Sequence, residues 1–81
     1  MHEKAILVGP SFESTKVAQL VQSASQFKSH ISLVVEEKTA NAKSIMGIIS
    51  LDLKSGNTVK VVAHGEDERQ AIGELEHIIA S

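Results

Sequence analysis

The chain has 81 residues, no cysteine, two phenylalanines as its only aromatic residues and a formal net charge of −2. This length fits one small domain, residues 1–81, and the lack of cysteine excludes disulfide scaffolds, thiolate nucleophiles and the usual structural zinc sites. The acidic balance and the shortage of aromatic rings argue against direct nucleic-acid binding, and the short apolar runs argue against a membrane span. We expect a cytosolic globular protein.

A strand and a helix are predicted in the first third of the chain. Residues 3–8 alternate as a strand, which the Gly-Pro-Ser run at residues 9–11 ends. From Ser14 to Phe27 apolar residues return every three or four positions, as on one face of a helix. They are Val17, Leu20, Val21, Ala24 and Phe27. Ser11 or Ser14 is expected to cap this helix.

Two further strands are predicted around a polar turn. Residues 30–36 alternate, the turn Glu36-Glu37-Lys38 follows, and residues 39–42 return as a short strand. The expected buried residues of the longer strand are Ile31, Leu33 and Val35.

Ser44 is predicted to cap a short helix at residues 45–49. Ile48 and Leu51 suit its buried side, because they lie three residues apart. Three apolar residues are then expected on or near the side that faces away: Ile45, Met46 and Ile49. They form either a surface for a partner or part of a helix that is apolar all round.

The last third of the chain predicts a strand and a helix. Residues 58–64 alternate as a strand, and an acidic run at residues 66–68 suits a helix start. The helix then buries Ala71, Ile72, Leu75, Ile78 and Ile79. The order β-α-β-β-α-β-α predicts an α+β sandwich, with a four-stranded sheet covered by helices on one face.

No residue pattern indicates an enzyme, a cofactor or a metal site. The four histidines are His2, His30, His64 and His77. None has a ligand partner at helical or hairpin spacing, and each is expected to be a surface residue. No glycine-rich phosphate loop occurs.

Two motifs carry a resemblance to a known family. The segment Asn-Ala-Lys-Ser-Ile-Met-Gly at residues 41–47 and Gly-Glu-Asp-Glu at residues 65–68 resemble the HPr family of the bacterial sugar phosphotransferase system. The likeness is greatest to its regulatory-serine members and runs without gaps over nearly the whole chain. It implies an open-faced sandwich with an antiparallel sheet.

The resemblance also implies that the family's phosphohistidine site is degenerate here. The family relays phosphate through a histidine at the start of the first helix, followed closely by an arginine and a proline. In this chain Glu13 stands in the place of the histidine, Thr15 in that of the arginine and Lys16 in that of the proline. We expect no relay, because a carboxylate cannot form the phosphoramidate. The charge of Glu13 either favours the helix start or imitates a phosphorylated histidine.

The family's regulatory serine is matched by Ser44. The resemblance implies phosphorylation there by an HPr kinase/phosphorylase and binding to a LacI-type catabolite control regulator, with Lys43, Ile45, Met46 and Ile49 as the expected partner surface. One alternative is a phosphocarrier or docking component that binds phosphotransferase-system enzymes. Another is an interaction module that has lost both activities.

Overall fold

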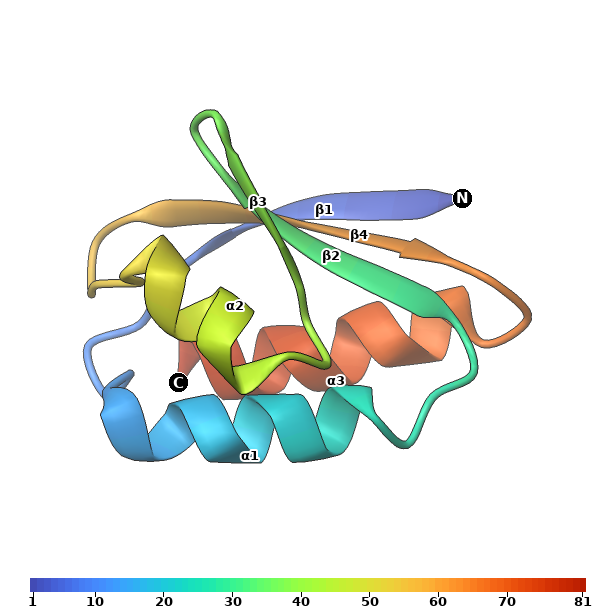
Figure 1. Ribbon diagram of the computed structural model, residues 1–81. Helices are drawn as coiled ribbons and strands as arrows, with labels where there is room; N and C mark the ends of the chain where they lie inside the picture. Colours follow the sequence, from blue (N-terminus) through green and yellow to red (C-terminus); the bar gives the residue numbers. More distant parts are fainter.

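The computed structural model describes all 81 residues and contains one four-stranded antiparallel sheet. The strands are β1 (His2–Leu7), β2 (His30–Val35), β3 (Lys38–Asn41) and β4 (Thr58–His64). Their order across the sheet is β1-β4-β2-β3, so β4 and β2 are the two central strands (Figure 1). The predicted strands and the antiparallel sheet are therefore confirmed.

Three helices cover one face of this sheet and leave the other face open (Figure 1). They are α1 (Ser14–Ala24), α2 (Ile45–Leu51) and α3 (Glu68–Ala80). Helices α1 and α3 lie side by side in opposite directions, and α2 packs against β3 and α1. No helix combines the length and the apolar character needed to cross a bilayer.

The core lies between the sheet and the helices, and 19 buried apolar residues form one cluster there. Strand β4 buries every second residue, and α3 buries all five residues of its predicted stripe. This agreement follows from periodicity, because a strand alternates its faces and a helix repeats every 3.6 residues.

The ends of α1 differ from the prediction. Glu13 occupies the N-cap position, without a side-chain cap bond, so the expectation of Ser11 or Ser14 is wrong. The backbone N–H of Ser11 is instead directed to the end of α3, where it donates to the carbonyl of Ser81. The helix also ends at Ala24, before the predicted Phe27. The N–H groups of Gln26 and Phe27 bond carbonyls three residues back instead of four, so the chain continues as a tighter turn toward β2.

Candidate functional site

Ser44 caps the short helix α2, as predicted. Its backbone is extended (φ −114°, ψ 115°), and its Oγ accepts a hydrogen bond of 3.1 Å from the backbone N–H of Gly47. The side chain is half-buried. The earlier N–H groups of the first turn have no partner within the helix, as in any α-helix. Ser44 therefore presents a reachable hydroxyl at the positive end of a helix.

Gly47 gives the Ser44 hydroxyl its room. A Cβ on Gly47 would lie 3.3 Å from Ser44 Oγ and 3.4 Å from the Cβ of Ala40, so any side chain there would crowd the cap. Ser44 and Gly47 line a polar groove between α2 and β3, together with Ser50 and the residues of β3. The cap is thus open on the side that faces β3.

The apolar residues of α2 divide between the core and the surface as predicted. Ile48 and Leu51 are buried, with 1% and 4% of their surface exposed. The Met46 patch, which we define as Ile45, Met46 and Ile49, is exposed to 48%, 73% and 55%. The helix is therefore not apolar all round within the core, and its outer side presents three large apolar side chains to solvent.

Lys43 makes a contact that the sequence did not reveal. Its Nζ donates a 2.8 Å hydrogen bond to the carbonyl of Phe27, in the turn after α1. Its backbone N–H donates to the side chain of Asn41. The ammonium group thus ties the start of α2 to the end of α1.

The residues expected to form a degenerate phosphohistidine site lie at the start of α1. Glu13 is exposed and accepts a long hydrogen bond of 3.5 Å from the hydroxyl of Thr15, and it forms no ion pair. The Nζ of Lys16 donates to the hydroxyl of Ser81, at the end of α3. The ammonium of Lys16 is therefore directed to the end of α3 and forms no ion pair with Glu13.

A groove of about 200 Å³ joins this site to the Met46 patch. It runs between α1 and α2, and its lining includes Glu13 and Val17 from one side and Ile49 and Leu53 from the other. Sequence reasoning missed this proximity, because the residues are distant along the chain and only the packing of α2 against α1 brings them together.

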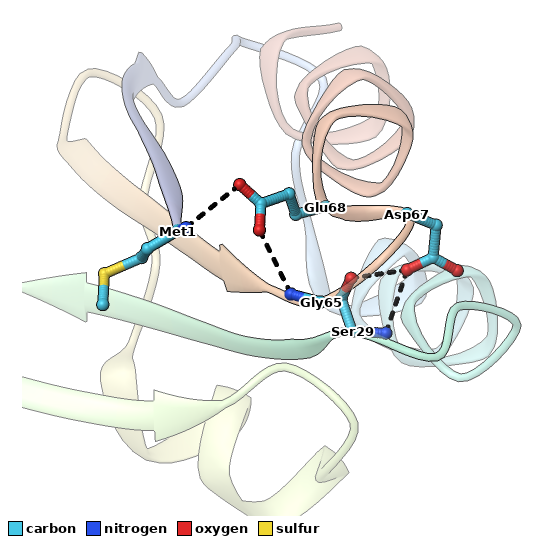
Figure 2. Close-up of polar contacts among 5 residues, drawn as sticks. All are labelled: Met1, Ser29, Gly65, Asp67 and Glu68. Carbon is cyan, nitrogen blue, oxygen red and sulfur yellow. Dashed lines mark hydrogen bonds and ion pairs between the residues drawn. The ribbon is translucent and has the colours of Figure 1, made fainter.

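The acidic motif at residues 65–68 has a structural role (Figure 2). The carboxylate of Asp67 accepts hydrogen bonds from the Ser29 hydroxyl, from the Ser29 N–H at 2.9 Å and from the Lys28 N–H at 2.8 Å. The Ser29 hydroxyl and the Lys28 N–H are the main causes that lower the pKa of Asp67 from 3.8 to about 2. Asp67 thus ties the start of β2 to the start of α3.

Glu68 joins the same corner to the start of β1 (Figure 2). Its Oε1 accepts a hydrogen bond of 3.2 Å from the N–H of Gly65, and its Oε2 lies 3.3 Å from the amino group of Met1. The Gly65 N–H is the main cause that holds the pKa of Glu68 below its usual value. Both acidic side chains therefore stabilise loops and lie on a different segment from Ser44.

The comparisons with known proteins agree with this fold. Residues 13–81 match the family model described as the PTS HPr component phosphorylation site. The chain belongs to the HPr family. The HPr-like protein Crh of Bacillus subtilis is 41% identical to it over 63 residues, which are 78% of this chain and 74% of that protein. The phosphocarrier protein HPr of Lysinibacillus sphaericus is 47% identical over 58 residues, 72% of this chain and 66% of that protein.

A solved structure supports the HPr fold directly. The crystal structure of HPr-C-His from Thermoanaerobacter tengcongensis superimposes with a TM-score of 0.92 and 42% identity, over 98% of this chain and 91% of that chain. Proteins of the HPr family are phosphocarriers or regulatory proteins, and they are not classical enzymes. Because an HPr-like protein and a phosphocarrier match at comparable identity, the choice between these roles depends on the site residues.

Proposed function

We propose that this HPr-family protein is a regulatory phosphoprotein, phosphorylated on Ser44 by an HPr kinase/phosphorylase and read by a LacI-type catabolite control regulator. The observation that carries the proposal is the position of Ser44: its hydroxyl caps α2 and lies on the same helix as the exposed Met46 patch. A partner can therefore contact the modified residue and the apolar side chains together.

The local geometry supports a phosphate on Ser44. A phosphoserine oxygen can keep the hydrogen bond from the Gly47 N–H, and the other free N–H groups of the first turn can satisfy further oxygens. The positive end of the helix dipole favours the added negative charge. Gly47 has no side chain to crowd the group. The modification would therefore add charge to the surface without breaking a core contact.

The partner surface follows from the exposures on α2. The Met46 patch offers flexible and apolar side chains, which suit a hydrophobic pocket beside a basic group that pairs with the phosphate. Lys43 precedes Ser44, but its ammonium already binds the Phe27 carbonyl. We assign recognition to the phosphate and the Met46 patch, and we assign to Lys43 the support of the loop that carries Ser44.

The second candidate is a docking component of the phosphoenolpyruvate-dependent phosphotransferase system. The supporting observation is the groove between α1 and α2, which Glu13 lines on one side and Ile49 on the other. In this role the chain would bind phosphotransferase-system enzymes without accepting phosphate, because Glu13 takes the place of the histidine and Lys16 is directed to Ser81.

Mass spectrometry after incubation with an HPr kinase/phosphorylase and ATP tests the first proposal. We expect one phosphate on Ser44 in the unaltered chain and in Ser50→Ala, and none in Ser44→Ala. Ser50 is a matched control, because its exposed hydroxyl lies on the same helix and bonds the Met46 carbonyl. Loss of the Ser44 cap costs about 0.5–2 kcal/mol, so circular dichroism must show that Ser44→Ala stays folded.

Two binding measurements separate the candidates. The regulatory role predicts that the phosphorylated chain binds a LacI-type regulator and that Ser44→Ala does not. Incubation with enzyme I and phosphoenolpyruvate should leave no acid-labile phosphate on the chain. Phosphate on another serine, or none, would overturn the regulatory role. Tight binding to enzyme I without phosphate transfer would favour the docking role.

A further inference from the structure

Two histidines far apart in the sequence lie directly opposite each other on the open face of the sheet. His30 begins β2 and His64 ends β4, and the antiparallel register pairs them. Both side chains are exposed. Their neighbours Ile31 and Ala63 are buried on the helix side, so the two imidazoles stand on the other side.

This spacing suits chelation of one metal ion. Residues that oppose each other in an antiparallel pair have Cβ atoms about 4.5–5.5 Å apart. An imidazole nitrogen binds a transition metal at about 2.0–2.1 Å, so two rings on facing positions can reach the same ion. We propose that His30 and His64 form a surface site for a divalent transition-metal ion of the class that prefers imidazole, namely Cu²⁺, Ni²⁺ or Zn²⁺.

The backbone on both sides of the pair is held in place. Strands β2 and β4 are the two central strands, and each is paired on both edges close to the histidines, β2 with β3 from Ser32 and β4 with β1 up to Ala63, while His30 and His64 pair with each other. Ser29, which precedes His30, is fully buried and bound by Asp67, and the N–H of Gly65, which follows His64, is bound by Glu68 (Figure 2). A Cβ on Gly65 would lie only 2.6 Å from Ser29 Oγ, so the two strand ends are closely packed. The ligands are thus preorganised, which lowers the entropy cost of binding.

The site has two protein ligands. No group of three or more histidine, cysteine or acidic side chains is arranged to hold a metal, so solvent would complete the coordination. Two nitrogen ligands favour Cu²⁺ over Ni²⁺ and Zn²⁺, following the general affinity order of these ions. Mg²⁺ and Ca²⁺ prefer oxygen ligands and should not compete.

Calorimetric titration of the whole chain with Zn²⁺ tests the proposal. We expect one site. His30→Thr and His64→Thr should each lower its affinity for Zn²⁺ by roughly 100-fold, because one imidazole alone lacks the added affinity that a second ligand on the same ion provides. Threonine suits exposed strand positions. The matched controls are His2→Ala and His77→Ala. His77 is also exposed but lies on α3, and variation of His2 tests binding of the metal by His2 together with the amino terminus.

A measurement on the unaltered chain does not depend on the variants folding. Ni²⁺ added in small amounts should broaden the NMR signals of the His30 and His64 rings first and together. The proposal is overturned if Zn²⁺ binds equally well to either threonine variant, if only His2→Ala abolishes binding, or if Mg²⁺ displaces Zn²⁺. It is also overturned if the broadening centres on His2 or His77, or if no Zn²⁺ binds at all.

Discussion

The carboxylate of Asp67 accepts hydrogen bonds from three donors in a segment distant in the sequence. Ser29 is fully buried, and Asp67 satisfies both its hydroxyl and its backbone N–H. A buried polar group without a partner is costly, so this one side chain allows the loop between α1 and β2 to pack closely against the start of α3. These hydrogen bonds stabilise the charged carboxylate and so lower the pKa of Asp67.

Acid should weaken the fold through Asp67. Its pKa is lowered to about 2, so its stabilising contribution is complete above the unfolded pKa of about 4 and is lost as the pH falls toward 2. Asp67→Asn keeps one acceptor but loses the charge and the second acceptor. Urea unfolding should therefore show a lower midpoint for Asp67→Asn at neutral pH, and the difference from the unaltered chain should narrow near pH 2.

The exposed neighbour Glu66 supplies the control for this measurement. It makes no hydrogen bond or ion pair, so Glu66→Gln should unfold like the unaltered chain at both pH values. A midpoint difference for Asp67→Asn that stays constant between pH 7 and about pH 2 would show that the charge of Asp67 does not contribute.

Helix α2 presents three different sides within seven residues. Ile48 and Leu51 enter the core, Ser44 and Gly47 face the groove toward β3, and the Met46 patch faces solvent. A helix this short cannot be stable alone, so its core contacts and its cap must hold it in place. The side turned to solvent is consequently free for a partner.

Substitutions on two sides of α2 should separate folding from binding. Met46→Asp should change the unfolding free energy by no more than about 0.5 kcal/mol, because Met46 is 73% exposed, and should weaken binding of the phosphorylated chain to a regulator. Ile48→Ala should cost about 2–5 kcal/mol, because Ile48 is 1% exposed. Thermal unfolding and a binding titration measure both. A large loss of stability in Met46→Asp would place Met46 in the core.

At the scale of the whole molecule, backbone hydrogen bonds join the loop after β1 to the end of α3. The N–H of Gly9 donates to the Ile79 carbonyl at 2.9 Å, and the N–H of Ser11 donates to the Ser81 carbonyl at 3.2 Å. The same end of α3 receives the ammonium of Lys16. These contacts fix the start of α1, and with it Glu13 and one wall of the groove beside α2.

Gly9→Ala should disrupt the contact between the loop after β1 and the end of α3. A Cβ on Gly9 would overlap the backbone oxygen of Ala80, which cannot move as a flexible side chain could. We expect a loss of about 1–3 kcal/mol in unfolding free energy, as for other overpacked sites. Gly73→Ala is the control, since its Cβ would meet nothing within 4 Å and alanine should stabilise α3 by about 1 kcal/mol. Equal effects of the two substitutions in chemical denaturation would contradict this account.

Local patterns in the sequence determined the strands, the helices and the serine cap. Alternating residues in β4 and the apolar stripe in α3 predicted which side chains are buried, since each element has its own repeat. Ser44 was found because capping acts within one turn. The predicted cap of α1 was wrong, because Ser11 is positioned by a backbone contact with the distant end of α3 and not by a local preference.

Only the tertiary structure decided which distant residues meet. The strand order β1-β4-β2-β3 sets His30 opposite His64. The loops at that end of the two central strands bring Asp67 to Ser29. The packing of α2 on α1 places Ile49 in one groove with Glu13. Periodicity shows which face of an element is buried, but it carries no information on which other element covers that face. That choice follows from the packing of the whole core, in which strands and helices distant along the chain bury their apolar faces together.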